Sequence, residues 1–459
     1  MVLRYSLHYL IARGIPALVN FLAIAVYTRL LSPDAYGRYI LVLAGVNIAN
    51  LTVFQWLRLS LVRYLPAYQE QEGVLLGTIG RIYLILMAGV GVLGGVAGLI
   101  VGGEWRSLVL VAVLLLWMQA WFELNVELLR ARLQTRAYGW AMGVRSVGAL
   151  ALGTLFILGG LGAFGPLLGL VLSMAVVGLG FAYRHWRTVK LQLDRERLRP
   201  LLRYGLPLAG TLILSYIVSV SDRFLIAWLL DEAQAGIYAA GYDLANQPVI
   251  LLMSIVNLAA YPLIVQVWEH EGEASAQAYL VRNLRLLLIV GVPATVGLAM
   301  LARPFGELVL GASFHSASAV VPLIALGTLL DGLRVYHTDL AFHLGQRTTR
   351  QLQIVLWVFL INLGLNLLWI PHMGIRGAAW ATVVAYGMAL ILSIWQGRNI
   401  QAVPLGFQEL LRTGGAGIGM GLGLWILTPW IGWVGAGIVG LVVYGLLLWA
   451  LYARPKIMI

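Results

Sequence analysis

The chain has 459 residues, of which 61% are hydrophobic and only 11% are charged. A soluble globular protein carries roughly 25% charged residues, so this composition excludes a water-soluble protein with an ordinary polar surface. The net charge is +12 and there is no cysteine, which excludes disulfides, thiolate metal sites and cysteine nucleophiles.

Apolar runs between charged or turn-rich breaks predict about fourteen transmembrane helices, because one span needs about 20 mostly apolar residues. In chain order the spans are expected at 7–31, 39–59, 82–101, 108–128, 140–160, 162–183, 205–230, 238–267, 284–302, 317–345, 351–370, 377–396, 413–430 and 433–452. The first apolar run is too long for a signal peptide, so no cleavable signal is expected. The longest polar interval, 184–203, is too short for a soluble domain. An all-α polytopic membrane protein is therefore predicted.

The distribution of Lys and Arg predicts the orientation, since cytoplasmic loops carry an excess of both. With the N-terminus in the cytoplasm, 23 of the 31 fall on the cytoplasmic side, five on the outer side and three within spans. Both termini are then cytoplasmic, in the inner membrane of a bacterium or archaeon. Topology and contact with anionic lipid explain the positive charge, so no nucleic-acid partner is expected.

An internal repeat at an offset of 199 residues divides the chain. Arg4-Tyr5 recurs as Arg203-Tyr204, and Asn47 recurs as Asn246. Both copies begin at the cytoplasmic face, which predicts two pseudo-symmetric bundles about an axis along the membrane normal, as in many transporters. The predicted organisation is a six-helix bundle at 1–183, a cytoplasmic linker at 184–203, a second six-helix bundle at 204–396 and two additional helices at 397–459.

Motifs spread along the chain carry a family resemblance. They are Leu31-Ser32-Pro33-Asp34-Ala35-Tyr36-Gly37-Arg38-Tyr39, Ser221-Asp222-Arg223-Phe224, Ala235-Gly236-Ile237-Tyr238, Asn257-Leu258-Ala259-Ala260-Tyr261-Pro262-Leu263, and the segment from Asn362 through Ile370-Pro371-His372-Met373-Gly374-Ile375-Arg376-Gly377-Ala378-Ala379. Together they resemble the lipid-linked oligosaccharide flippases of the multidrug, oligosaccharidyl-lipid and polysaccharide exporter superfamily. The resemblance implies alternating-access transfer of a polyprenyl-pyrophosphate-linked sugar chain to the outer leaflet, for O-antigen, capsule or exopolysaccharide.

Four arginines are the candidate substrate contacts, because a cavity lined by cations can replace the hydration that a diphosphate loses in the membrane. Arg334 lies midway along its span, one turn after Asp331, and Arg223 and Arg145 also lie within spans. Arg13 is the candidate first contact on the cytoplasmic side. The alternative readings are that Arg334 only neutralises Asp331, and that Arg13, Arg145 and Arg223 extend to the lipid headgroups.

Acidic side chains within spans are candidates for ion coupling or for balancing the arginines. They are Glu123, Asp222, Asp243 and Asp331. Glu123 lies four residues before Glu127, on the same helix face, and could balance Arg13 or Arg145.

No catalytic set, metal cluster or phosphate-cradling glycine loop is apparent, which predicts a transporter without a cofactor, driven by Na⁺ or H⁺, membrane potential or mass action. The glycine run 414–419 lies inside a predicted span, where it favours close helix packing. Expected partners are the lipid-linked oligosaccharide, the bilayer and polysaccharide-assembly proteins. Three alternatives stay open: an ion-coupled multidrug exporter, a membrane sugar polymerase or ligase, and a scaffold for polymer assembly.

Overall fold

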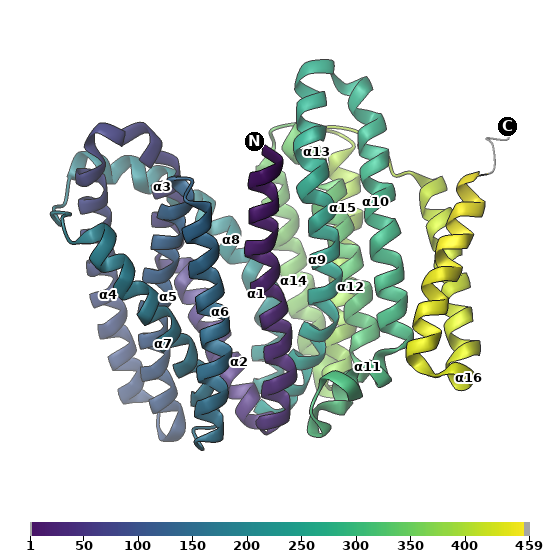
Figure 1. Ribbon diagram of the computed structural model, residues 1–459, viewed down its shortest axis with the longest axis horizontal. Helices are drawn as coiled ribbons and strands as arrows, with labels where there is room; N and C mark the ends of the chain where they lie inside the picture. The colour runs from purple at the N-terminus through teal and green to yellow at the C-terminus, as the bar shows by residue number, and fades with distance from the viewer. Residues whose placement is uncertain (1, 454–459) are drawn as a thin grey trace. The chain divides into compact units, whose positions relative to one another are not determined.

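The computed structural model describes the backbone of residues 2–453, and the side chains of residues 14–453 other than 15, 69, 211 and 348. Every regular element in these residues is helical, which confirms the all-α prediction (Figure 1). The chain forms two compact units, unit 1 (Met1–Phe224) and unit 2 (Leu225–Ile459). Their boundary falls inside a helix and not in the linker 184–203, so the predicted division into two six-helix bundles stays a prediction.

Unit 1 contains seven helices and most of an eighth. They are α1 (Val2–Leu30), α2 (Pro33–Val53), α3 (Gln55–Tyr64), α4 (Glu72–Ile100), α5 (Gly103–Ala131), α6 (Thr135–Leu158), α7 (Phe164–Phe181) and α8 (Arg195–Leu229), with short irregular helices η1 (Leu65–Gln71) and η2 (Ala182–Trp186). The break between α1 and α2 has capping chemistry: the Ser32 hydroxyl accepts from the Ala35 amide at 3.4 Å, and Pro33 occupies the first turn.

The predicted span 39–59 is not one straight helix. It bends by 48° at Phe54, between α2 and the segment that begins with α3. Phe54 is fully buried and its ring centroid lies 5.4 Å from that of Tyr83. The apolar pattern carried no sign of this bend, because neither Gly nor Pro stands at it. The bend therefore coincides with the tertiary packing of Phe54 and could not be predicted from the local sequence.

Unit 2 contains the remaining helices. They are α9 (Glu232–Glu271), α10 (Glu273–Met300), α11 (Ala302–Val309), η3 (Ala312–Ala319), α12 (Val321–Leu333), η4 (Arg334–Thr338), α13 (Leu340–Leu344), α14 (Thr348–Met373), α15 (Ile375–Gly397) and α16 (Phe407–Ala453). The predicted span 317–345 bends by 54° after η3. The predicted spans 413–430 and 433–452 both lie in α16, which breaks at Gly432, where φ is 71°, and Figure 1 shows its two segments running back alongside each other.

The number of candidate spans among the described residues depends on how the bent helices are counted. Among the described residues, ten helices are long and apolar enough to cross a membrane, or up to twelve when each bent pair counts as one span. The predicted number of about fourteen is therefore not confirmed. Part of the difference lies in α16, which is a single candidate span here and two in the prediction.

Part of the helix packing recurs in both units. In unit 1, α5 packs against α2, α4 and α7, and α7 packs against α6. In unit 2, α12 packs against α9, α10 and α15, and α15 packs against α14. The repeated asparagines occupy matching places: Asn47 in α2 accepts from Gln119 in α5 at 2.7 Å, and Asn246 in α9 donates to Thr328 in α12 at 3.1 Å. These contacts recur in both units, and the pseudo-symmetry of two whole bundles stays a prediction.

Two glycines of the run in α16 pack closely, whereas a Cβ atom at Gly414 or Gly415 would meet nothing within 4 Å. A Cβ atom at Gly417 would lie 2.7 Å from Val292 of α10, and one at Gly419 would lie 2.3 Å from Leu447 in the second segment of α16. Both distances are below ordinary carbon contacts, so only glycine allows these approaches without a shift of the neighbouring side chain.

Candidate functional site

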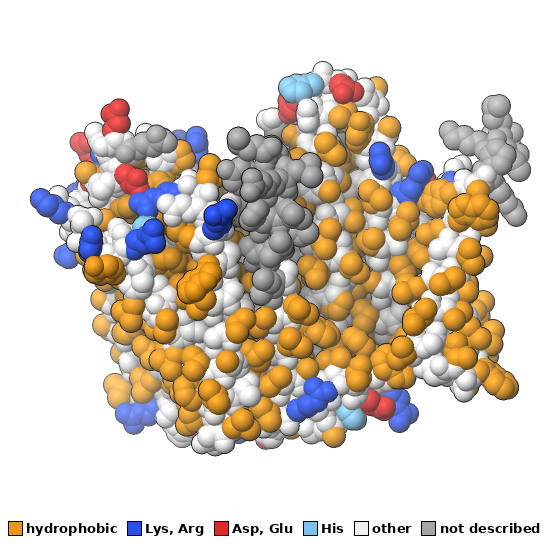
Figure 2. Space-filling view, in the orientation of Figure 1, with side chains coloured by type: hydrophobic (Ala, Val, Ile, Leu, Met, Phe, Trp, Pro, Cys, Tyr) orange, Lys and Arg blue, Asp and Glu red, His pale blue; other side chains and the backbone are white. Residues whose placement is uncertain are grey.

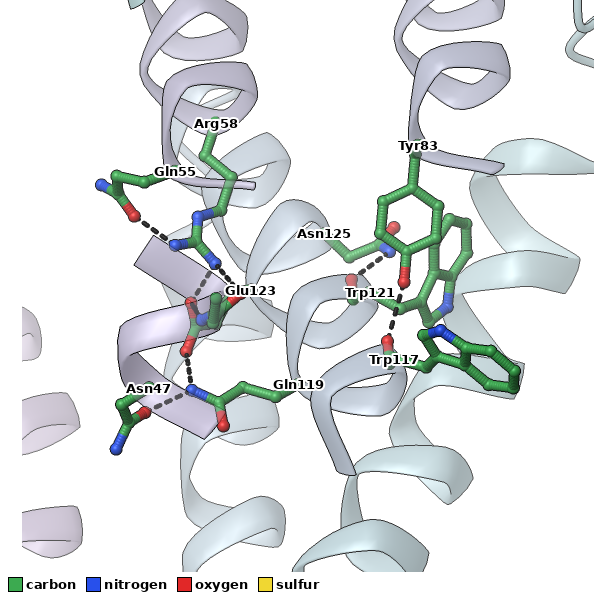
Figure 3. A network of polar contacts seen from close by, with 10 residues as sticks. Asn47, Gln55, Arg58, Tyr83, Trp117, Gln119, Trp121, Glu123 and Asn125 are labelled. Atoms are coloured by element: carbon green, nitrogen blue, oxygen red, sulfur yellow. Dashed lines mark hydrogen bonds and ion pairs between the residues drawn. The ribbon is translucent and has the colours of Figure 1, made fainter. Parts of the chain in front are cut away.

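A polar network lies inside unit 1, where α2, α3 and α5 meet (Figure 3). It consists of Asn47, Asn50, Gln55, Arg58, Gln119 and Glu123, and is called the unit 1 network below. Arg58 is only 3% exposed, and its guanidinium forms an ion pair with the Glu123 carboxylate. Its Nη1 also donates to Asn50 Oδ1 at 3.1 Å, and its Nη2 donates to Gln55. The buried charge is therefore both paired and hydrogen-bonded.

Amide side chains complete the network. Gln119 Nε2 donates to Asn47 Oδ1 at 2.7 Å and to Glu123 Oε1 at 3.0 Å. Asn50 Nδ2 donates to Glu123 Oε2 at 2.8 Å. Both oxygens of Glu123 thus accept hydrogen bonds, and a fully satisfied network of this kind holds its members in one arrangement.

Arg145 lies near this network without a direct carboxylate partner. It is half-buried in α6, and its guanidinium stands 5.5 Å from the centroid of the Phe122 ring. Glu123 is within electrostatic range of it, but no ion pair of Arg145 occurs among the described residues. Arg145 is consequently a cation that a ligand anion could approach.

The predicted partner of Glu123 needs correction. The sequence suggests that Glu123 balances Arg13 or Arg145, whereas its direct partner is Arg58. Arg58 was omitted because it stood at the end of a predicted span, and the bend at Phe54 places it in the interior. Three further polar residues close to it in sequence, Asn47, Asn50 and Gln55, were a signal that could have identified it. The side chain of Arg13 lies outside the described residues.

A second charged group lies inside unit 2 and is called the unit 2 cluster: Arg334, Asp331 and Asp339. Arg334 Nε and Nη2 donate to Asp331 Oδ1 at 3.0 and 2.8 Å, and Nη1 donates to Asp339 Oδ2 at 2.7 Å. The predicted pairing of Asp331 with Arg334 is confirmed, and Asp339 is an additional partner that the prediction did not include.

Local helix geometry brings the third member of the cluster into contact. Arg334 begins η4, a π-helical turn that widens the helix and brings residues five apart together. Asp339 is 0% exposed and also accepts from Ser393 Oγ at 2.6 Å and from Gln351 Nε2 at 3.0 Å. With all three groups ionised, two carboxylates share one guanidinium and the cluster has a formal charge of −1.

The other predicted residues with described side chains are Asp222, Arg223 and Asp243. Asp222 is buried in α8 and accepts from the backbone amide of Arg223 at 2.9 Å, and Arg223 is half-buried. Asp243 is half-buried in α9. In the part of the chain that the structure describes, no group of three or more His, Cys, Asp or Glu could hold a metal ion. The roles of the predicted site residues stay predictions.

Comparison with known proteins identifies the family. Residues 26–319 match the family described as polysaccharide biosynthesis protein. The chain belongs to this family. The succinoglycan biosynthesis transport protein ExoT of Rhizobium meliloti is 26% identical over 313 residues, which cover 67% of this chain and 62% of ExoT. The probable low-salt glycan biosynthesis flippase Agl15 of Haloferax volcanii is 23% identical over 395 residues, covering 85% of this chain and 82% of Agl15.

Other relatives of this family member match over shorter segments. The lipopolysaccharide biosynthesis protein WzxC of Escherichia coli is 26% identical over 173 residues, which cover 37% of this chain and 34% of WzxC. The matched segments thus span less than two thirds of both ExoT and WzxC.

Solved structures share the fold. A structure of the lipid II flippase MurJ in an inward closed conformation superposes with a TM-score of 0.81 at 15% identity, covering 98% of this chain and 99% of that one. An inward-facing multidrug resistance transporter of the MATE family superposes with a TM-score of 0.58 at 17% identity, covering 85% and 97%. Family membership and the apolar helices together establish a multi-pass membrane protein, and the solved structures show its fold.

Proposed function

We propose that this protein is a flippase that moves a polyprenyl-pyrophosphate-linked oligosaccharide from the cytoplasmic to the outer leaflet of the inner membrane, by alternating access and without bond chemistry. The observation that carries the proposal is the match of residues 26–319 to a polysaccharide biosynthesis family. The exported unit then enters O-antigen, capsule or exopolysaccharide through polysaccharide-assembly proteins.

The arginines of unit 1 suit the diphosphate. An arginine binds phosphate oxygens through a planar fork and stays protonated at any relevant pH. Arg145 has no direct carboxylate partner among the described residues. We assign diphosphate contacts to Arg145 and Arg223, and the first cytoplasmic contact to Arg13. Arg334 is held by two carboxylates, which favours a charge-balancing role over substrate contact.

The excess negative charge of the unit 2 cluster suits ion coupling. A buried carboxylate without its own cation favours uptake of a proton or Na⁺, because isolated buried charge is costly. Asp331 and Asp339 are therefore proposed to bind the coupling ion while the protein moves the lipid-linked diphosphate from the cytoplasmic to the outer leaflet. Asp222 and Asp243 are the further candidates.

The two segments of α16 are proposed to border the path of the polyprenyl tail. They stand outside the sequence repeat, and large apolar side chains such as Trp425 and Trp430 are exposed on them. Deleting the residues beyond Arg412 should abolish transport while the rest of the chain stays folded. A correctly folded truncated protein with full export would remove α16 from this role.

The orientation is testable because the chain has no cysteine. Cysteines introduced singly at positions 195 and 233 should react differently with an impermeant thiol reagent added to intact cells. Position 233 should label and position 195 should not. The reverse pattern would place both termini outside.

Transport itself is tested in proteoliposomes that hold a fluorescent polyprenyl-pyrophosphate disaccharide in the inner leaflet. The wild-type protein should expose the sugar to an external quencher faster than protein-free vesicles do. The same vesicles loaded with a cationic dye test the multidrug alternative. The fold similarity to a MATE transporter is the observation that favours this alternative. Dye efflux without sugar exposure favours that alternative, and lengthening of the sugar chain would indicate a polymerase or ligase.

A further inference from the structure

A concave site of about 640 Å³ opens in unit 1 among the ends of three helices. It is called the basic pocket and is lined by Leu59, Val62, Arg63, Pro66, Ala67, Arg130 and Tyr204. These residues come from α3, η1, the last turn of α5 and the start of α8. Figure 2 shows Lys and Arg gathered over the upper end of unit 1, above a hydrophobic band. The charge distribution predicts that the lining segments face the cytoplasm.

The two arginines of the basic pocket are incompletely neutralised. Arg63 is exposed and makes no hydrogen bond or ion pair among the described residues. Arg130 is 42% exposed and lies 3.0 Å from Glu127, which does not line the pocket. Both arginines stand in the last turn of a helix, where the helix dipole supplies partial negative charge. The partial negative charge at the helix ends reduces the repulsion between the two arginines but does not neutralise them. The pocket therefore attracts an anion.

An aromatic and apolar wall adjoins these cations. Tyr204 packs edge-on against Tyr64 with ring centroids 5.9 Å apart, and Tyr64 lies 6.2 Å from Tyr68. Tyrosines with one apolar and one polar end are typical of the depth at which lipid headgroups lie. Leu59 and Val62 line the same cavity. The combination of two guanidinium groups, a phenol and an apolar wall matches a phosphate ester attached to hydrocarbon.

The start of α8 is fixed against α3, so this pocket is preformed. The Ser60 hydroxyl donates to the Leu201 carbonyl at 2.8 Å. A Cβ atom at Gly205 would lie 2.2 Å from the Trp56 carbonyl oxygen, so glycine is needed for the helices to approach this closely. Tyr204 is held next to this crossing, and a preformed site loses less entropy on binding.

We infer that the basic pocket binds the phosphate of a membrane lipid headgroup, with Arg63 and Arg130 as its two cationic ligands. One possible headgroup is the pyrophosphate of the polyprenyl carrier, and this part of the inference rests on the proposed function. The phosphate of an anionic bilayer phospholipid is the other source of the same chemistry. In either case the pocket is a site distinct from Arg58 of the unit 1 network and from Arg145.

Binding is measured on the full chain, purified in neutral detergent, by native mass spectrometry. The probes are undecaprenyl pyrophosphate, phosphatidylglycerol and inorganic pyrophosphate. Arg63→Gln and Arg130→Gln should each weaken lipid binding about tenfold, and the double variant about a hundredfold, because each removes a charge-assisted contact. Arg136→Gln is the matched control, since Arg136 is exposed but does not line the pocket. It should bind as the wild type does.

The lipid arms distinguish the sources. A selective loss of undecaprenyl pyrophosphate identifies the carrier as the ligand, and a parallel loss of phosphatidylglycerol identifies a bilayer phospholipid. The inference is overturned if the double variant binds both lipids as the wild type does, or if inorganic pyrophosphate binds as tightly as the lipids. Sugar exposure in proteoliposomes is scored separately. Unchanged lipid binding in the double variant, with sugar exposure by the wild-type protein, overturns only the pocket. Absent sugar exposure by the wild-type protein, with a binding loss in the double variant, overturns only the flippase proposal.

Discussion

In unit 1 the buried guanidinium of Arg58 faces one carboxylate, Glu123, and two amides, whereas in unit 2 that of Arg334 faces two carboxylates, Asp331 and Asp339. With Arg145 included, the unit 1 group has a formal charge of +1 and the unit 2 cluster has −1. The two units share helix packing and a repeated asparagine contact, so the repeat preserves the frame while the charges diverge.

For the proposed flippase, this divergence suits two separate tasks. An excess cation attracts the diphosphate, and an excess carboxylate attracts a proton or Na⁺. A single site serving both would neutralise itself. We therefore propose substrate contact for unit 1 and ion coupling for unit 2, and the predictions below test this division.

The largest effect is expected from breaking the buried pair of unit 1. Glu123→Leu leaves the Arg58 charge unpaired at 3% exposure and should destabilise the protein by about 3–5 kcal/mol. Thermal unfolding of the purified protein, followed by tryptophan fluorescence, measures it. The double variant Arg58→Met, Glu123→Leu is the control and should recover most of the loss. A single variant as stable as the wild type would contradict the buried pair.

The next effect concerns the two carboxylates of unit 2. Asp339→Asn should cost about 2–4 kcal/mol, because it removes a charged acceptor of three hydrogen bonds in a fully buried place. Asp331→Asn should cost about 1 kcal/mol, since Asp331 is 23% exposed and water can replace it. If the cluster couples an ion, either variant also loses the dependence of transport on a Na⁺ or pH gradient. Unaltered gradient dependence in both would move coupling elsewhere.

Arg145 tests the cationic side of the comparison. Arg145→Gln should lower the rate of sugar exposure in proteoliposomes about tenfold or more, equivalent to a lost charge-assisted contact, with little change in unfolding temperature. Arg145→Lys should retain part of the rate, because it keeps the charge and loses the fork. Arg81→Gln, at an exposed position in α4, is the control. Equal rates in all three variants would remove Arg145 from the substrate path.

The smallest effect tests the shared frame. Asn47→Ala removes a contact with Gln119, and Asn246→Ala removes one with Thr328. Each should cost about 1 kcal/mol, the net value of an ordinary hydrogen bond. Matching losses in thermal unfolding support equivalent places in the two units. If only one variant loses stability, the two repeated asparagines do not contribute equally to the free energy of unfolding.

Several features of the fold and site were accessible from the sequence alone. Apolar run lengths predicted helices such as α4, α6 and α15 because, in hydrocarbon, the backbone must satisfy its own hydrogen bonds within the helix. The repeated Asn positions make matching contacts in the two units, and the equivalence of the two halves as a whole stays a prediction. Asp331 and Arg334 were paired correctly because residues three apart share a helix face. All of these inferences depend on interactions within a few residues, or on patterns that need no contact.

Only the tertiary structure decided the contacts between distant segments. Arg58 reaches Glu123 because α2 and α3 bend at Phe54 and pack on α5. Asp339 joins Arg334 because a π-helical turn replaces the regular helix, and Ser393 meets it from α15. The basic pocket joins Arg63, Arg130 and Tyr204 from three segments. The packing of whole helix faces determines which charged side chains come into contact inside a membrane. Local hydropathy does not indicate a contact between residues some sixty positions apart.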